Sequence, residues 1–584
     1  MKDVQLECGL AEESYKYIAG KLVDFTRKKF DLVSGRRDWV AFQLMLKGDE
    51  EFTVSTGDNP TFSVKGPLLN IRVHVEVEGI PQSCIRLYPI GTVEDDDGIQ
   101  KADMLLKNEV VTVAKDAVQP IWVEIDIPED VQPGNHQGTI SIFAHRMFED
   151  EKKVAAMFFN VMVKDVVLPR PSEYRFHLDL WQHLSNIARK HEVRLWSDEH
   201  FRVLEEYVKS LAQLGQKAIT IIASEIPWSG QRSYRVKDYP SDMFEYSMVK
   251  VEKDLNGNFI YDFSAVKRYI ELCFKYGIDK EIEVFGLCNI WEDDEFGYGK
   301  VATDYPDAIR VRYYDRADSC YKYMRDAKDI SAYIKALESF FIENGWIELV
   351  RIIADEPSDM ELYEKRLEAI KNAAPQFKFK AAINHAEFIK RFKRQISDYV
   401  PMLPCVCQEW DSLKEMAGKD IERLLWYVCC WPLYPNTFIS SPLLESRLIG
   451  LLTAYMNFDG FLRWNYTVWP EKPRERISFR YPEWRAGDTN FVYPGMDGAP
   501  ILTIRYKNLK RGIEDYELIQ MLKGVHPHSD EILSKVWSRI FKFKDIAELA
   551  PEAGKKPEEL YSLDYEDYMA VKEYLLDEIS QYKD

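Results

Sequence analysis

Two adjacent carboxylates, Asp355 and Glu356, follow an apolar run in the segment IELVRIIADEP, residues 347–357. Residues 349–353 are mostly β-branched and apolar, which is typical of a parallel strand covered on both faces. In an eight-stranded β/α barrel, polar groups at the carboxyl ends of the strands form the active-site face. The pair is therefore a candidate for acid–base catalysis. A surface turn with Ser358 capping the next helix is the alternative, and these residues alone leave both readings open.

The elements that would position this pair form a repeating pattern after residue 175, in which apolar strands alternate with amphipathic helices. The expected strands are 176–183, 218–224, 281–287, 349–356, 377–384, 399–405, 424–430 and 460–466. The expected helices include 198–215, 264–277, 329–345 and 445–457, each ending at Gly or Asn. Eight such units predict a (β/α)8 barrel, and the loops 225–262 and 466–502 are expected to wall its cleft.

The regions on either side of the barrel have different patterns. From residue 38 to 164, short alternating segments separated by turns predict an antiparallel β-sandwich. The stretch 12–30 has helical spacing and is compatible with a helix packed on that sandwich. We therefore expect a multidomain chain: an N-terminal β-sandwich over residues 1–168, a catalytic barrel over 169–524, and a short C-terminal helical extension over 525–584.

Composition excludes several classes of partner. The net charge is −19, and no basic block is present to meet the phosphates of nucleic acid or an anionic membrane surface. No apolar run approaches the roughly 20 residues that span a bilayer. The first residues, MKDVQLECGLAEES, lack the apolar core of a signal peptide, so the expected location is cytoplasmic, although a trimmed secreted chain would look the same.

The cysteines point to neither disulfides nor metal. Their number, nine, is odd, and Cys273, Cys288, Cys429 and Cys430 lie inside apolar runs, as reduced core residues do. The Cys405-x-Cys407 pair has no second ligand pair nearby at zinc-site spacing. We expect no metal and no cofactor.

Aromatic content is the main compositional signal. Tyr, Phe and Trp make up 13% of the chain, with 14 Trp residues. Sugar rings present flat C–H faces bordered by hydroxyls, so aromatic platforms beside carboxylates and amides suit a carbohydrate ligand. Packing in a large core explains any single Trp equally well. The tryptophans near predicted strand ends are Trp181, Trp228, Trp291, Trp410, Trp464 and Trp469.

Together with IIADEP, three later segments resemble glycoside hydrolase family 123, the β-N-acetylgalactosaminidases. They are GFLRWNYTVWP (460–470), FVYPG (491–495) and IRYKNLKRGIEDYELI (504–519). The resemblance implies that a terminal or internal β-linked N-acetylgalactosamine is cleaved with retention by substrate-assisted catalysis. It further implies that Glu356 is the general acid and base, and that Asp355 orients the 2-acetamido group.

Further candidates for substrate contact come from the ends of other strands. His177, Asp179, Trp181 and His183 alternate along the first strand and share one face, which fits either substrate contact or a polar core network. The complete set of candidate substrate-binding residues is His177, Asp179, Trp181, Asn384, His385, Trp410, Arg463, Trp464 and Tyr466. Trp410 or Trp464 could be a platform under the sugar, and Tyr466 could donate to the acetamido oxygen, but Arg463 could equally pair with an inner carboxylate and Trp464 could pack in the barrel.

Two other functions stay open. A different barrel glycosidase, such as a β-galactosidase or β-N-acetylglucosaminidase, is one. If it worked by double displacement, it would need a second carboxylate across the cleft, and the available acids are Asp179, Glu225, Glu409 and Asp488. The other is a non-catalytic glycan-binding protein, against which the intact acid pair argues.

Overall fold

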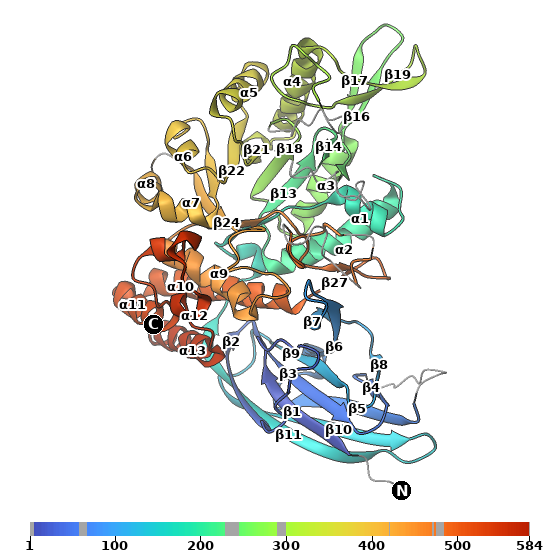
Figure 1. The fold of residues 1–584 in the computed structure, drawn as a ribbon, viewed down its shortest axis with the longest axis vertical. Helices are drawn as coiled ribbons and strands as arrows, with labels where there is room; N and C mark the ends of the chain where they lie inside the picture. The colour runs from blue at the N-terminus through green and yellow to red at the C-terminus, as the bar shows by residue number, and fades with distance from the viewer. Residues whose placement is uncertain are drawn as a thin grey trace.

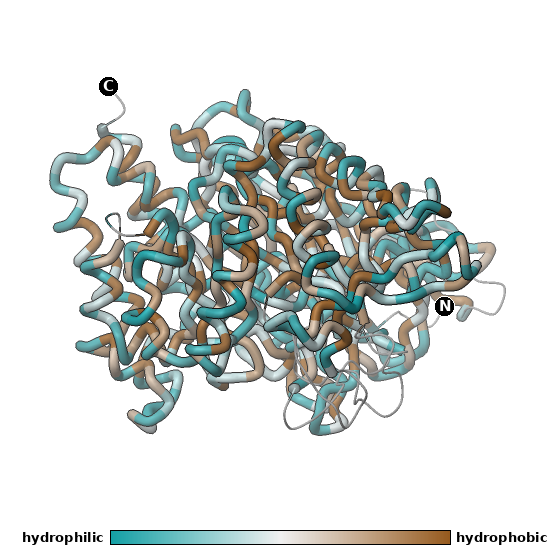
Figure 2. Tube along the Cα trace, turned by 90° about the horizontal axis from the view of Figure 1, so that it is seen from above, coloured by the Kyte–Doolittle hydropathy of each residue, from teal (hydrophilic) through white to brown (hydrophobic). Residues whose placement is uncertain are grey.

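The protein consists of a two-sheet sandwich, a barrel and a group of C-terminal helices. The structure is a computed structural model that describes residues 5–57, 67–227, 244–288, 299–417, 419, 421–469, 472–474 and 484–582. Figure 1 shows the sandwich at one end in blue and cyan, the barrel at the other, and the red C-terminal helices beside their junction. Hydrophobic and hydrophilic residues alternate closely along the chain, as expected for strands and helices that each bury one face (Figure 2).

The sandwich is built from eleven strands in two sheets, which confirms the predicted N-terminal architecture. One sheet has the order β1-β3-β9-β6-β7 and the other β2-β11-β10-β5-β4-β8. Most neighbours are antiparallel, but β2 with β11 and β4 with β5 are parallel. The strands are β1 (Leu6–Glu12), β2 (Lys29–Arg36), β3 (Asp38–Gly48), β4 (Phe52–Ser55), β5 (Leu69–Val77), β6 (Ile85–Glu94), β7 (Gln100–Leu105), β8 (Val110–Val113), β9 (Val118–Ile127), β10 (Gly134–Arg146) and β11 (Lys152–Val167).

The helical reading of residues 12–30 is wrong. This stretch forms no helix and leads into β2. Some of its backbone hydrogen bonds go to other segments: the Ala19 N–H donates to the Gln100 carbonyl at 2.9 Å, and the Arg27 carbonyl accepts from the Leu10 N–H at 2.9 Å. Pairing with existing strands therefore overrides a local helical pattern.

Eight parallel strands form the barrel at the predicted positions. Their order is β12-β25-β24-β23-β22-β21-β18-β13. The two end strands meet where the Lys217 N–H donates to the Leu178 carbonyl at 2.9 Å, so the sheet is nearly closed. The strands are β12 (His177–Leu180), β13 (Ala218–Ile222), β18 (Glu281–Phe285), β21 (Val350–Asp355), β22 (Lys378–Ile383), β23 (Asp398–Pro401), β24 (Arg423–Tyr427) and β25 (Gly460–Arg463).

Helices surround the barrel, and the expected caps end several of them. Gly215 ends the second helix at φ 87°, and Asn457 ends the ninth at φ 56°, both in the left-handed region that stops a helix. The helices are α1 (Leu184–Lys190), α2 (Asp198–Leu214), α3 (Ser264–Lys275), α4 (Ala327–Glu343), α5 (Met360–Ala373), α6 (Glu387–Arg391), α7 (Leu403–Gln408), α8 (Trp410–Met416), α9 (Leu443–Met456), α10 (Ile504–Val525), α11 (Ser529–Ile540), α12 (Pro557–Leu560) and α13 (Tyr565–Gln581).

Short strands occupy the long connections at the carboxyl ends of the barrel strands. A four-stranded sheet of order β17-β16-β19-β20 lies beside α4, at the end of the molecule remote from the sandwich (Figure 1). Trp228 and Trp291 lie outside the described residues. The short strands are β14 (Ile226–Pro227), β15 (Phe244–Glu245), β16 (Lys250–Lys253), β17 (Phe259–Asp262), β19 (Arg312–Asp315), β20 (Cys320–Tyr323), β26 (Tyr493–Pro494) and β27 (Pro500–Ile501).

Buried ion pairs join α10 to the sandwich. The Arg505 guanidinium lies 2.8 Å from Asp103, and the Lys507 ammonium lies 2.8 Å from Glu124. Arg511 pairs with Asp38 at 3.1 Å, and its guanidinium stacks 3.8 Å from the centre of the Trp39 ring. Helix α10 is therefore buried between the two domains, with charges matched across the interface.

Within the described part of the chain, no helix is long and apolar enough to cross a membrane.

Candidate active site

The acid pair lies where β21 ends. Asp355 is the last residue of the strand, and Glu356 adopts φ 48°, a left-handed conformation that is uncommon outside glycine. Side chains of consecutive residues in a regular strand point to opposite faces, whereas this change of conformation turns the chain at Glu356. The Glu356 N–H still donates to the Ala382 carbonyl of β22 at 3.0 Å, which holds the turn against the barrel. Strain of this kind often occurs at functional sites.

Two neutral donors hold the Glu356 carboxylate. The Tyr427 hydroxyl donates to Oε1 at 2.5 Å, and the Asn384 amide donates to Oε2 at 3.0 Å. Burial raises the pKa of Glu356, while the Tyr427 hydrogen bond and nearby His385 oppose that rise. Burial is the largest cause of a raised pKa at Tyr427, and the negative charge of Glu356 is the next largest. The charge of Asp355 raises this pKa as well. Tyr427 therefore interacts with both acids.

Two of the predicted substrate-binding residues lie beside this pair. Asn384 and His385 directly follow β22, the neighbour of β21 in the sheet. The His385 side chain is partly exposed, with 44% of it accessible. Tyr427, the last residue of β24, was not predicted; its position at a strand end beside Cys429 and Cys430 was the available signal.

Arg463 and Trp464, at the end of β25, pack within the structure. Arg463 is fully buried and pairs with Asp488 at 2.8 Å, as its alternative interpretation expected. Its other nitrogen donates to the Asn436 Oδ1 at 2.8 Å, so Arg463 ties two loops to the barrel. Burial raises the pKa of Asp488, the partner of Arg463, to about 6. The Trp464 ring lies 5.6 Å from that of Trp484.

Two aromatic candidates are buried in contacts with other parts of the barrel. The Tyr466 hydroxyl is buried 2.5 Å from the Ser210 hydroxyl of α2, so Tyr466 packs toward the helix. Trp181 is also buried, with its ring 4.9 Å from that of Phe285. In the structure as it stands, the Tyr466 hydroxyl is not directed at an open site.

Trp410 lies elsewhere because β23 is shorter than expected. The strand ends at Pro401, and α7 begins at Leu403, so Trp410 follows a helix and starts α8. Its ring lies 6.0 Å from Phe458, which precedes the amino end of β25. The structure therefore does not place Trp410 among the residues around Glu356.

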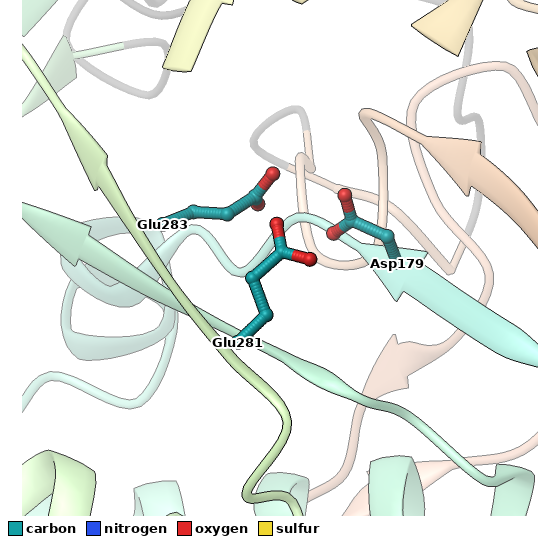
Figure 3. Close-up of side chains that lie close together, drawn as sticks. All are labelled: Asp179, Glu281 and Glu283. Atoms are coloured by element: carbon teal, nitrogen blue, oxygen red, sulfur yellow. The ribbon is translucent and has the colours of Figure 1, made fainter. Parts of the chain in front are cut away.

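His177 and Asp179 belong to a charged network inside the barrel. Asp179, Glu281 and Glu283 point toward one another from β12 and β18 (Figure 3), and their oxygens lie within 4.8 Å of one another. The Lys380 ammonium lies 2.5, 2.8 and 2.7 Å from these three carboxylates, respectively. His177 pairs with Glu281 at 2.8 Å. Lys380 thus supplies the positive charge that a metal ion would bring.

The comparisons identify the fold and the family. The family model for the glycoside hydrolase 123 catalytic domain matches residues 181–522, and that for the glycoside hydrolase 123 N-terminal domain matches residues 91–144. No curated protein matches the chain significantly.

Among solved structures, a family 123 glycoside hydrolase from Clostridium perfringens, described for the details of glycolipid glycan hydrolysis, has a TM-score of 0.74 at 19% identity. The match covers 99% of this chain and 98% of that one. A GH10 xylanase from Thermobacillus composti has a TM-score of 0.28 at 11% identity, over 58% of this chain and 97% of that one. The matched catalytic domain covers more than half of the chain, together with its N-terminal partner, so this chain is an enzyme that belongs to glycoside hydrolase family 123.

Proposed function

We propose that this enzyme releases β-linked N-acetylgalactosamine from glycans, including glycolipid glycans, with retention and by substrate-assisted catalysis. The single observation that carries the proposal is the Glu356 carboxyl. It sits next to Asp355 at a barrel strand end, bonded by neutral donors and with its pKa raised by burial. A raised pKa favours the protonated form of the carboxyl, which a general acid requires.

In the proposed mechanism, the substrate supplies the nucleophile. Glu356 protonates the glycosidic oxygen while the 2-acetamido oxygen attacks C1, giving an oxazolinium ion. Asp355 accepts the acetamido N–H, which orients the group and stabilises the positive charge that develops on it. Glu356 then takes a proton from the water that opens the ring, so the two inversions at C1 give net retention.

The positions of the other acids support this mechanism over double displacement. That alternative needs a second carboxylate about 5 Å across the cleft. Asp179 is paired with Lys380, and Asp488 with Arg463. Glu225 accepts from the Tyr323 hydroxyl at 2.5 Å, and Glu409 pairs with Lys390 at 2.9 Å. Each of these four candidates is engaged in other contacts.

Two features support the choice of substrate. The preference for a galacto-configured sugar rests on family membership, and the glycolipid source rests on the description of the Clostridium perfringens relative.

The test is hydrolysis of aryl β-glycosides of N-acetylgalactosamine, N-acetylglucosamine and galactose by wild type, Asp355→Asn and Glu356→Gln. Turnover of the N-acetylgalactosaminide and a loss of about 10²–10⁴ in kcat for both variants are expected. The Glu356→Gln loss should shrink with activated leaving groups, which need little protonation.

The matched controls are Asp359→Asn and Glu361→Gln. Asp359 caps α5 through its side-chain oxygen, which Asn retains, and Glu361 is exposed on the first turn of the same helix. Both controls should keep wild-type activity. Hydrolysis of the plain galactoside at a comparable rate would contradict the acetamido mechanism, and binding without turnover of any glycan would favour the non-catalytic alternative.

A further inference from the structure

A cavity of about 600 Å³ lies beside the barrel on the side of the β16–β20 sheet. Its walls include Arg194 and Trp196 between α1 and α2, the first turn of α3, and side chains of β16, β19 and β20. Glu225, three residues beyond the end of β13, also lines it. Glu225 and Glu356 both follow the carboxyl ends of barrel strands, with β18 between them. Two strand spacings separate these strand ends by roughly 10 Å, so the cavity borders the active-site face.

Cations outnumber acids among the residues that line the cavity. Of the described residues that line it, four are cationic and two are acidic, Glu225 and Asp262, although the chain as a whole carries −19. The cations are Arg194, Lys250, Arg268 and Arg312.

The four cations differ in how far they are already neutralised. Arg268 pairs with Asp198 at 2.7 Å, Lys250 with Glu252 at 2.8 Å, and Arg312 approaches Glu225 at 3.5 Å. Arg194 is exposed and forms no ion pair within the described part of the chain. Its guanidinium is thus available to an anionic ligand, and its fork of donors suits a carboxylate or sulfate.

Aromatic rings complete the lining. Trp196 adopts φ 60°, a strained conformation for a large side chain, and is held by a hydrogen bond from its Nε1 to the Ser247 carbonyl at 3.2 Å. Its ring also lies 5.2 Å from that of His200. Tyr246, Tyr314 and Tyr321 line the same cavity. A fixed indole beside free polar groups is suited to the C–H face of a sugar ring.

We propose that this cavity is a second saccharide-binding site that takes an acidic sugar unit, with Arg194 binding its carboxylate or sulfate ester and Trp196 contacting its ring. The choice of a saccharide rests on the proposed hydrolase function. Both sources of negative charge share the same recognition chemistry, and the site is separate from the Asp355–Glu356 pair. An acidic branch of a substrate glycan would bind in this cavity while the N-acetylgalactosamine of the same glycan is bound beside Asp355 and Glu356.

Ligand-observed NMR titration of the full chain tests the site without turnover. The probes are N-acetylneuraminic acid, galactose 6-sulfate, galactose and inorganic sulfate. Wild type is expected to bind at least one acidic sugar at least tenfold more tightly than galactose or inorganic sulfate, and the two acidic probes separate the carboxylate from the sulfate source. Arg194→Gln and Trp196→Ala should each weaken that binding roughly tenfold.

The matched control is Arg202→Gln, which removes an exposed arginine of α2 whose nearest acid is Glu199 at 3.7 Å and which does not line the cavity. Its binding should equal that of wild type. Equal weakening by Arg194→Gln and Arg202→Gln, equal affinity for inorganic sulfate, or no binding of either acidic sugar would overturn the proposal. Hydrolysis of a neutral aryl glycoside is measured in parallel, so failure of the second site and failure of the proposed activity give different results.

Discussion

The barrel contains two groups of acids that contrast sharply. Inside it, Asp179, Glu281 and Glu283 are completely buried around the Lys380 ammonium. At its carboxyl end, Glu356 is only partly buried and is held by a tyrosine and an amide. Among the described residues, no lysine or arginine pairs with Glu356.

The difference separates carboxylates that hold the barrel together from carboxylates that can transfer a proton. Burial and neighbouring carboxylates raise the pKa of Asp179 and Glu283, although Lys380 opposes that rise. A carboxylate that also has a second cation stays ionised, because the neighbouring charges lower its pKa. Glu281 shows this: burial opposes ionisation, but Lys380 and Arg423 lower its pKa well below the usual range. Glu356 has neutral donors instead, and its pKa is raised. Acidic residues in a barrel are therefore better interpreted from their partners than from their number.

The largest expected effect comes from Lys380→Met, which leaves the interior carboxylates without their shared cation. Breaking a buried ion pair by removing one partner costs about 3–5 kcal/mol. We expect a loss of that size in the free energy of unfolding, measured by urea denaturation. Lys378→Met is the control, because Lys378 lies on the same strand but pairs with more exposed Glu348 and Glu422. A loss of less than 1 kcal/mol for Lys380→Met would break the contrast between the two groups.

Within the interior group, Glu281→Gln and Glu283→Gln should differ in how much they lower the free energy of unfolding. Burial and the charge of Asp179 raise the pKa of Glu283 well above its usual range, so Gln resembles the form already present. Glu281 is ionised, and Glu281→Gln should cost about 3 kcal/mol at pH 7, against under 1 for Glu283→Gln. Because the native pKa of Glu281 is depressed, its contribution is present above the unfolded pKa and is lost as the pH falls through the native value. Urea denaturation at pH 7 and at pH 3 should show that the difference in free energy of unfolding between the two variants is smaller at pH 3.

Tyr427→Phe tests how neutral donors tune the catalytic acid. Loss of the hydroxyl removes a hydrogen bond that favours ionised Glu356, so the pKa of Glu356 should rise further. Because a general acid must be protonated, the alkaline limb of the pH profile of kcat/KM should move to higher pH. We expect kcat to fall about tenfold from poorer positioning. Tyr399→Phe, whose hydroxyl is buried without a hydrogen-bond partner among the described residues, should leave the profile unchanged.

The smallest expected effect is a gain of stability in Glu356→Gln. Since the native pKa of Glu356 is raised, its ionised form destabilises the fold as the pH rises above the unfolded value near 4.3. Gln removes that cost, and the free energy of unfolding at pH 8 should increase by up to about 1 kcal/mol. The gain should vanish at pH 4. A loss of stability at pH 8 would place Glu356 with the structural acids.

The architecture could be predicted well from the sequence, because apolar periodicity and the Gly, Asn and Pro residues that end elements are local signals. All eight barrel strands and the capped helices α2, α3, α4 and α9 occur where apolar periodicity placed them. Asp355 and Glu356 were found because a strand end is visible as the point where an apolar run stops. Their assignment as the catalytic pair stays a prediction.

The contacts of the candidate acids could not be predicted from the sequence, because they depend on which strands become neighbours in the barrel. Tyr427 reaches Glu356 from three strands away in the sheet, and the partners of Lys380 lie on β12 and β18. The misplacement of Trp410 came from a helix that begins with Leu403-Pro404, where proline at the start favours helix over further strand. Each case needed the tertiary arrangement.

The ion pairs along α10 bear on how this enzyme can be divided or recombined. A fragment that lacked the sandwich would leave Arg505 without Asp103, Lys507 without Glu124 and Arg511 without Asp38. Uncompensated charge of that kind favours unfolding or aggregation. The barrel is therefore not a module that could be exchanged among proteins by itself, and we expect the sandwich to be inherited with it as one unit.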